Sequence, residues 1–239
     1  MKIVVTGGSG RFGQVLQNFK TKHKILFPSK KKLDILNYNK ISNYLKKEKP
    51  DILIHLAGLS RPMEIHDKKI SKSIDLNIIG TANITKACSE KKIKLIYFST
   101  NYVYPGNRGN YKESDPIKPI NNYAWSKLGG EASVKLYKNS LILRVSMTEK
   151  PFVHKSAFAN AKSSFLYQDQ VASILFKVLN QKGVLNIGGK SQIIYDFVIK
   201  ENKNVKKIFL NKKSNYGIPK NSSLNISRLK RILGKTNIL

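Results

Sequence analysis

The sequence of 239 residues is poor in several residue types, and each scarcity excludes a class of protein. Its one cysteine, Cys88, excludes an internal disulfide and a zinc site built on several cysteines. No apolar run approaches the roughly 20 residues that cross a bilayer, and the apolar stretch after Lys2 is too short for a signal peptide. The four histidines show no metal-ligand spacing, so we expect no metal. We expect a cytoplasmic globular protein that does not associate with membranes.

Acidic residues are also scarce, because 14 Asp and Glu stand against 44 Lys and Arg, for a net charge of +30. Strong basicity is typical of nucleic-acid-binding proteins. Nearly all of the basic residues are lysine, however, and they are spread along the whole chain beside abundant Asn and Ile, which share A/T-rich codons with lysine. We therefore expect no specific nucleic-acid partner. The positive field would still attract an anionic substrate or cofactor.

Hydrophobic residues make up 41% of the chain, enough for a sizeable core. In the first half, short apolar runs alternate with segments of helical periodicity, which is the pattern of an α/β fold with a doubly wound, Rossmann-like parallel sheet. The predicted strands are residues 2–6, 24–27, 51–57, 94–98 and 141–145, and the predicted helices are residues 11–20, 39–47, 70–91 and 122–137.

The pattern loosens after residue 147. We expect helices at 168–181, 193–200 and 226–233, a strand at 184–187 and an irregular basic segment at 203–220. These expectations divide the chain into two parts. Residues 1–146 form a dinucleotide-binding core with the catalytic residues, and residues 147–239 form a small substrate-binding lobe that packs on the core and contributes in part to its sheet.

A glycine-rich segment connects the first predicted strand to the first predicted helix. Gly7, Gly10 and Gly13 have the spacing of a dinucleotide-binding bend, with Arg11 and Phe12 at the start of the helix. The glycines allow a sharp turn, a close approach of the backbone to a pyrophosphate and tight helix–strand packing, while the helix amides face the anion. The position of this triplet at a strand–turn–helix predicts a dinucleotide cofactor.

The residues after the second predicted strand indicate which dinucleotide binds. NAD-preferring sites present an acidic residue about 20 positions beyond the glycines, but this chain has Ser29 and Lys30 there, followed by further lysines. A hydroxyl and ammonium groups suit a 2′-phosphate. We therefore favour NADP(H), with NAD(H) as the alternative.

A second motif predicts proton transfer. Tyr123 and Lys127 begin a predicted helix at i, i+4 spacing, which places the phenol and the ammonium on one face. A nearby cation stabilises the phenolate and makes tyrosine a better acid/base group. Thr100 follows the predicted strand 94–98, so its hydroxyl belongs at the carboxyl edge of the sheet, where α/β proteins bind ligands.

These motifs together resemble those of extended short-chain dehydrogenases/reductases, and among them the dTDP-4-dehydrorhamnose reductase type of sugar-nucleotide reductase. The similar segments are VVTGGSGRFG at 4–13, LDIL at 33–36, HLAG at 55–58, DLNIIGTANI at 75–84, FSTNYVYPG at 98–106 and YAWSKLGGE at 123–131. Weaker similarity continues to about residue 224. The chain differs from this type at Asn101, where these reductases usually have Asp, and it is shorter after the fifth strand.

The resemblance implies a role for each matching residue. Tyr123 would protonate the substrate carbonyl oxygen, Lys127 would hold the nicotinamide ribose and tune Tyr123, and Thr100 would bind the reacting oxygen. Asn77 would brace the catalytic helix. The cofactor-binding residues would be Gly7, Gly10, Arg11, Phe12, Gly13, Ser29, Lys30, Asp34, Ile35, Leu56, Ala57, Gly58, Asn77 and Lys127.

Five further residues are candidates for binding the sugar nucleotide. Asn101 and Tyr102 follow the strand that ends near Thr100, and Arg61 follows the HLAG segment. Arg144 ends a predicted strand, and Lys150 begins the predicted lobe. The two arginines and the lysine suit a diphosphate, with ordinary surface or core positions as the alternative.

Three functions fit this reading. The first is NADPH-dependent reduction of a nucleotide-linked 4-keto-deoxysugar for surface polysaccharide synthesis. The second is a nucleotide-sugar epimerase that keeps its NAD(P) tightly bound, and the third is a non-catalytic dinucleotide-binding regulator. Because helices of this fold class often pair two subunits, a homodimer also remains open.

Overall fold

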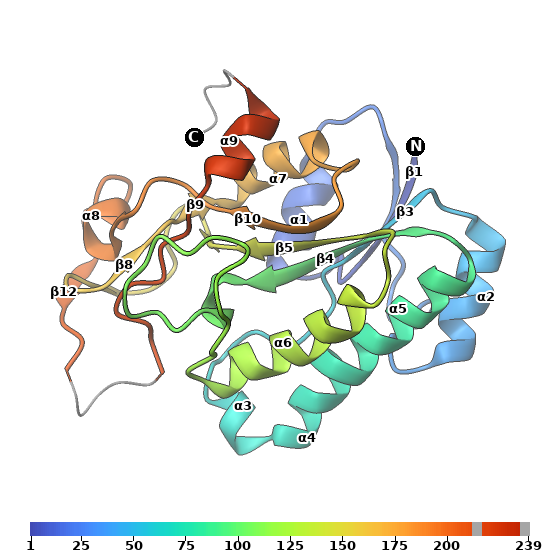
Figure 1. Ribbon diagram of the computed structural model, residues 1–239, viewed down its shortest axis with the longest axis horizontal. Coiled ribbons are helices and arrows are strands. Elements are labelled where there is room, and N and C mark those ends of the chain that lie inside the picture. The colour runs from blue at the N-terminus through green and yellow to red at the C-terminus, as the bar shows by residue number, and fades with distance from the viewer. Residues whose placement is uncertain (212–216, 235–239) are drawn as a thin grey trace. The chain divides into compact units, whose positions relative to one another are not determined.

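The computed structural model describes residues 1–211 and 217–234, and its centre is a six-stranded sheet (Figure 1). The strand order is β10-β5-β4-β3-β1-β2, and β2, β1, β3 and β4 pair in parallel. The strands are β1 (Lys2–Thr6), β2 (Lys24–Leu26), β3 (Ile52–His55), β4 (Lys94–Thr100), β5 (Ser140–Val145) and β10 (Gly183–Ile187). The predicted doubly wound α/β sheet is confirmed.

The predicted helices of the first half are also present. They are α1 (Arg11–Asn18), α2 (Tyr38–Glu48), α4 (Ile70–Ser73), α5 (Gly80–Glu90) and α6 (Asn122–Lys135), and the short α3 (Ile65–Lys68) was not predicted. The helical pattern predicted over 70–91 is confirmed from Ile70 to Glu90, and its middle part is a π-helical segment, η1 (Ile74–Ile79), between α4 and α5. The helical periodicity could not reveal this change of register.

Alternating side chains of the strands supply the core on the two faces of the sheet. Val4, Leu53 and Leu95 pack in one cluster with residues of α2, α5 and α6, and Figure 1 shows α5 and α6 side by side on this face. On the other face, the ring of Phe12 from α1 lies 5.1 Å from that of Phe98, centroid to centroid. Both faces of the strands are therefore covered, as their nearly continuous apolar sequences predict.

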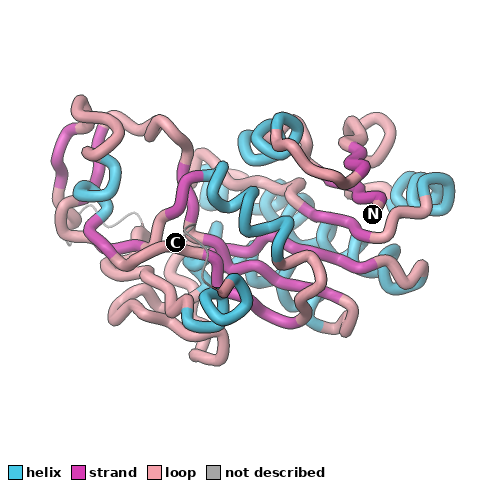
Figure 2. The backbone as a smooth tube through the Cα atoms, turned by 90° about the horizontal axis from the view of Figure 1, so that it is seen from above, coloured by secondary structure: helices cyan, strands magenta, loops and turns pink. Residues whose placement is uncertain are grey.

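The chain divides into two compact units. The first unit comprises residues 1–99, 125–143 and 180–184, and the second comprises residues 100–124, 144–179 and 185–239. Beyond the sheet, the second unit contains short helices and short strand pairs, drawn in cyan and magenta respectively in Figure 2. The elements are η2 (Asn101–Val103), β6 (Met147–Thr148), β7 (Ser156–Phe158), β8 (Lys162–Ser163), β9 (Leu166–Tyr167), α7 (Gln168–Lys177), β11 (Gln192–Ile193), α8 (Ile194–Val198), β12 (Lys206–Ile208) and α9 (Ser227–Leu233).

The predicted elements after residue 147 are largely present as α7, β10, α8 and α9. Residues 203–220 were expected to be irregular, but they contain β12, which pairs in parallel with β7. Residues 212–216 of that segment lie outside the described residues. The predicted division at residue 146 stays a prediction. None of the helices in the described ranges is long and apolar enough to span a membrane.

Candidate functional site

The glycine bend between β1 and α1 has room for backbone only. Gly7 has a φ of +75°, and a Cβ there would lie 2.6 Å from the backbone nitrogen of Ala57. A Cβ on Gly13 would lie 2.5 Å from the carbonyl oxygens of Gly7 and Gly8. These distances explain the glycines physically, because a side chain at either position would displace the bend.

The position of the bend in the sheet suits a phosphate ligand. β1 has β2 on one side and β3 on the other, so the chain reverses its winding direction at β1, and open α/β sheets bind ligands at such a point. The N-terminus of α1 begins after Gly10 without a side-chain cap, so its amides and positive dipole end are available to an anion. The Leu56 and Ala57 amides, which follow β3, donate to Thr6 at 3.2 and 3.3 Å, and Gly58 follows them exposed.

The residues predicted to bind the adenosine end lie in the same unit. Ser29 and Lys30 are exposed just after β2, as a 2′-phosphate site requires. Ile35 is buried, whereas Asp34 is half-buried and accepts a hydrogen bond from the Leu36 amide at 3.0 Å. The glycine bend, the uncapped helix and the exposed Ser29 and Lys30 fit NADP.

Asn77 lies in η1 and holds two other parts of the unit. Its side chain accepts from the Leu59 amide at 2.7 Å and donates to the Leu59 carbonyl at 2.8 Å. It also donates to the Ser126 hydroxyl on α6 at 2.8 Å. The π-helical segment thus positions the side-chain amide of Asn77 so that it hydrogen-bonds both to the loop after β3 and to α6.

Lys127, the second residue of the proton-transfer motif, is half-buried on α6. Its ammonium lies 4.2 Å from the ring centroid of Tyr97, whose hydroxyl donates to the Lys127 carbonyl at 3.0 Å. Withdrawal from water lowers the pKa of Lys127 to about 7, and the negative charge of Glu131 opposes that shift. Within the described ranges, no hydrogen bond from this ammonium is present, so its donors can serve a ligand.

Tyr123 lies four residues before Lys127 on α6, so the regular turn of the helix places the two on one face. Its ring meets that of Tyr102 edge to face, with 6.5 Å between centroids. The Tyr102 amide donates to the Thr100 hydroxyl at 3.2 Å. The turn after β4 therefore brings Thr100 and Tyr102 to the start of α6, while the buried Asn101 donates to the Ser222 carbonyl at 3.1 Å.

Arg144, a candidate for the substrate diphosphate, is only 4% exposed at the end of β5. Its guanidinium donates to the Tyr104 hydroxyl at 2.8 Å and to the Glu113 carbonyl at 3.2 Å. The Tyr104 hydroxyl donates in turn to Asn186 at 3.0 Å. These bonds give Arg144 a structural function within the second unit, and its role in substrate binding remains a prediction.

The other two cationic candidates are placed differently. Arg61 is half-buried in the loop after β3. Lys150 is exposed, pairs with Glu201 at 3.1 Å and lies 5.3 Å from the Tyr167 ring centroid. These positions do not identify a ligand, so the substrate-binding roles of Arg61 and Lys150 remain predictions.

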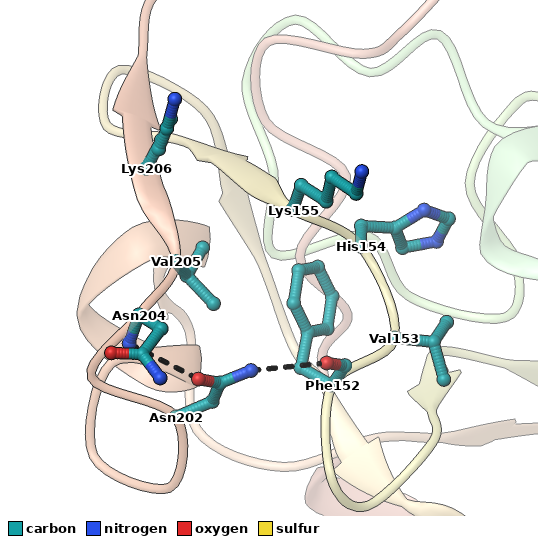
Figure 3. Close-up of a pocket in the computed structure, with 8 residues that line it drawn as sticks. All are labelled: Phe152, Val153, His154, Lys155, Asn202, Asn204, Val205 and Lys206. Carbon is teal, nitrogen blue, oxygen red and sulfur yellow. Dashed lines mark hydrogen bonds between the residues drawn. The ribbon is translucent and has the colours of Figure 1, made fainter.

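A surface pocket of about 270 Å³ lies elsewhere in the second unit (Figure 3). Its lining comprises Phe152, Val153, His154, Lys155, Asn202, Asn204, Val205 and Lys206. Asn202 donates to the Phe152 carbonyl at 3.4 Å and accepts from the Asn204 amide at 3.1 Å, which ties the two lining segments together. None of the predicted site residues lines this pocket.

The predicted site residues did not include Glu131, Ser99 or Ser126, although all three lie beside them, and Ser99 was noted only as a hydroxyl at the end of its strand. Ser99 donates to Glu131 at 2.7 Å inside the first unit. The signal for Glu131 was its spacing, because it follows Lys127 by four residues and so lies on the same helical face. Ser99 and Ser126 carry no comparable signal, because their partners are distant in sequence.

Comparison with known proteins gives similar relatives in sequence and in structure. The chain is 28% identical over 152 residues to a dTDP-4-dehydrorhamnose reductase of Aggregatibacter actinomycetemcomitans, which covers 62% of this chain and 51% of the relative. It is 26% identical over 142 residues to methionine adenosyltransferase 2 subunit beta of Pongo abelii, covering 56% of this chain and 42% of that protein. The chain thus spans about half the length of these curated relatives.

A solved structure shows the same fold over nearly the whole chain. The dTDP-4-dehydrorhamnose reductase of Bacillus anthracis, in complex with NADP, superposes with a TM-score of 0.86 at 24% identity, covering 98% of this chain and 92% of that one. The family model described as RmlD substrate binding domain matches residues 1–160, which include the glycine bend and α6. The chain therefore belongs to the RmlD substrate binding domain family.

Proposed function

We propose that this protein is an NADPH-dependent reductase that acts on the keto group of a nucleotide-linked 4-keto-deoxysugar. The observation that carries the proposal is the state of Lys127. Lys127 is half-buried, and burial lowers its pKa to about 7. Its ammonium lies over the Tyr97 ring and donates no hydrogen bond within the described ranges, and Tyr123 lies one helical turn away. A cation kept in this way costs stability, so a function in binding or catalysis explains its retention.

The chain's own residues supply the binding and the proton. NADPH would supply the hydride that reaches the carbonyl carbon. Gly7, Gly10 and Gly13 would admit its pyrophosphate to the start of α1, and Ser29 and Lys30 would bind a 2′-phosphate. Thr100 would hold the carbonyl oxygen by a hydrogen bond, and Tyr123 would donate its phenolic proton to that oxygen. The products are then NADP⁺ and an alcohol, and Tyr123 recovers its proton from solvent.

Lys127 would have two tasks in this reaction. Its free donors would bind the nicotinamide ribose, and its positive charge would stabilise the Tyr123 phenolate that forms on proton transfer. The B. anthracis structure with NADP supports the choice of cofactor. The name of the A. actinomycetemcomitans relative supports the choice of substrate class.

A second candidate is a dinucleotide-binding regulatory subunit without its own catalysis. The similarity to a protein named as the beta subunit of methionine adenosyltransferase 2 favours it. A subunit that only binds has no need of Tyr123 as a proton donor. The presence of Thr100, Tyr123 and Lys127 together therefore favours the reductase.

The direct experiment measures NADPH and NADH oxidation with a panel of dTDP-, UDP- and GDP-linked 4-keto sugars. We expect oxidation of NADPH with at least one sugar, and a decrease of about 1,000-fold in kcat for Tyr123→Phe, the scale of a lost acid/base group. Tyr137→Phe is the matched control, because Tyr137 lies just beyond α6 and its hydroxyl donates to the Ile93 carbonyl at 3.0 Å.

Two outcomes would contradict the proposal. Sugar conversion without net NADPH oxidation would identify an epimerase. Tight NADPH binding with no conversion of any sugar, together with unchanged biological activity of Tyr123→Phe, would identify the regulatory subunit.

A further inference from the structure

The face of α6 that carries Tyr123 and Lys127 continues to a third ionisable residue. Glu131 follows Lys127 by four residues, so its side chain projects from the next turn of the same face. It is only 2% exposed. A carboxylate is rarely buried to this extent unless it is hydrogen-bonded or close to a cation, and Glu131 has both kinds of neighbour.

The hydrogen-bond partner of Glu131 comes from the sheet. The Ser99 hydroxyl, near the end of β4, donates to the Glu131 Oε2 atom at 2.7 Å. Tyr97, two residues earlier on the same strand, lies under the Lys127 ammonium at 4.2 Å from its ring centroid. β4 therefore contacts both charged groups of α6, one through a hydroxyl and the other through a ring face.

Few other titratable groups face Lys127. From β3 comes His55, whose ring nitrogens lie 2.7 Å from the Thr6 hydroxyl and 3.1 Å from the Thr81 hydroxyl. Burial lowers the pKa of His55 to about 3, so this ring is neutral near pH 7. From β4 comes the Tyr97 ring. Tyr123 and Glu131 lie on α6 itself. Among the described residues around Lys127, Glu131 is the anionic group.

We infer that Glu131 is a positioning residue that acts through Lys127, its carboxylate keeping the ammonium protonated so that the lysine can serve Tyr123 and the cofactor. This inference rests on the proposed reductase function. The physical reason is the balance at Lys127, where loss of hydration lowers the pKa and the Glu131 charge raises it. Without the carboxylate, the lysine would be largely neutral near pH 7 and would give the phenolate no support.

The first test is the pH profile of kcat/KM for Glu131→Gln, which keeps the size of the side chain and removes its charge. A carboxylate one helical turn from an ammonium stabilises its charged form and raises its pKa, on a scale of about one unit. We therefore expect the alkaline limb of the profile to move down by about one pH unit, with a loss of about 10-fold near pH 8 and little loss near pH 6. Glu131→Asp keeps the charge and should restore most of the profile.

The matched control is Glu90→Gln, which removes an exposed carboxylate at the end of α5 that bonds the Tyr38 hydroxyl. Its profile should coincide with that of the wild type. An unchanged limb in Glu131→Gln, or a loss that is equal at every pH, would overturn the inference, because a merely structural role lowers activity without moving the limb.

A second measurement determines the protonation state of Lys127 directly and does not depend on catalytic activity. In protein labelled with ¹³C at the lysine ε carbon, the Lys127 resonance is assigned by its absence in Lys127→Met, and its titration midpoint is followed by NMR. We expect a midpoint near 7 in the wild type, and one lower by about one unit in Glu131→Gln. An unmoved midpoint in Glu131→Gln contradicts the inference.

The two measurements separate the inference from the proposed function. If no sugar is reduced but the midpoint moves, the proposed function fails and the electrostatic pairing stands. If a sugar is reduced and the midpoint does not move, the inference alone fails. Should Glu131→Gln not fold, Ser99→Ala tests the same pairing, because release of the carboxylate should lower the midpoint by a smaller amount, and no movement in that variant counts against the inference.

Discussion

Several cations in each compact unit lie over tyrosine rings, and two of them, Lys127 in the first unit and Arg144 in the second, have different hydrogen-bond surroundings. In the first unit the Lys127 ammonium lies 4.2 Å from the Tyr97 centroid, and in the second the Arg144 guanidinium carbon lies 5.0 Å from the Tyr104 centroid. Arg144 donates to Tyr104 and to the Glu113 carbonyl, whereas no hydrogen bond from the Lys127 ammonium is present in the described part of the chain. A buried cation whose donors are hydrogen-bonded indicates a structural role, and a half-buried cation whose donors are not hydrogen-bonded indicates a functional one.

The surroundings of Arg144 support this distinction. Tyr104 and Tyr111 stack with 4.8 Å between ring centroids, and Asn186 donates to the Tyr111 carbonyl at 2.8 Å. The Asn186 amide also donates to Glu113 at 3.1 Å. The guanidinium thus completes a network that fixes the segment after β4, and removal of its charge would leave several buried polar atoms without partners.

The largest effect on activity is expected at Lys127. Lys127→Met should lower kcat/KM by about 1,000-fold, because both the ribose donor and the charge beside Tyr123 are lost. Steady-state kinetics at saturating NADPH measures it. Lys135→Met, in the last turn of the same helix, is the matched control. If Lys127→Met kept an activity within a few-fold of the wild type, the functional role of Lys127 would be contradicted.

The largest effect on stability is expected at Arg144. Arg144→Met should lower the free energy of unfolding by about 3 kcal/mol, since the Tyr104 hydroxyl loses a charged partner and the Glu113 carbonyl loses a donor. Urea unfolding followed by circular dichroism measures it. Arg228→Met, on the short helix α9, is a control on another arginine of the same unit. A change below about 0.5 kcal/mol, as for an ordinary surface position, would contradict the structural role.

The glycine bend offers a graded test in the first unit. A Cβ on Gly13 would lie 2.5 Å from two backbone oxygens, whereas a Cβ on Gly10 would lie 3.2 Å from one. Gly13→Ala should therefore weaken NADPH binding by about 10-fold or more, equivalent to about 1.4 kcal/mol, and Gly10→Ala should weaken it less. Fluorescence titration gives both constants. The reverse order would show that the pyrophosphate does not rest on this bend.

The lowered pKa of Lys127 predicts a pH dependence of stability with a fixed sign. Its pKa is about 7 in the folded protein and 10.5 for an ordinary lysine, so between these values the unfolded chain binds more protons and stability rises with pH. The wild type should gain stability relative to Lys127→Met as the pH rises through this window. Urea unfolding of both proteins at several pH values measures the gain, and a constant difference would show that the ammonium is hydrated as usual.

The smallest effect is expected at the exposed Lys30. Lys30→Ala should reduce the preference for NADPH over NADH by about 3-fold, the scale of an exposed charge pair. The ratio of the two kcat/KM values measures it, with Lys46→Ala on α2 as the control. An unchanged ratio would place the 2′-phosphate away from Lys30.

The contrast between the units also explains what could be predicted from the sequence. The strands β1 and β5 are continuous apolar runs and the helices α1 and α2 show helical periodicity, so their prediction was confirmed to within a few residues. The strands β6, β8 and β9 have two residues each, too few to show alternation. They form because distant segments pair, which a local pattern does not contain.

The same limit applies to the candidate site. The glycines and the Tyr123–Lys127 pair follow local spacing, so their placement in the strand–turn–helix and on one helix was predictable. The environment of Arg144 was not, because Tyr104 and Asn186 lie 40 and more residues away along the chain. Glu131 had the right spacing, but only the fold shows that it is buried and bonded to Ser99.

The most direct test of the division between a functional and a structural cation is the initial rate of NADPH oxidation by Arg144→Met, expressed per folded molecule with a nucleotide-linked 4-keto sugar. At a temperature where the variant is folded, we expect a rate within about 3-fold of the wild type, as for a substitution that alters stability alone. A folded Arg144→Met that loses about 1,000-fold, the scale of a missing catalytic group, would contradict this division.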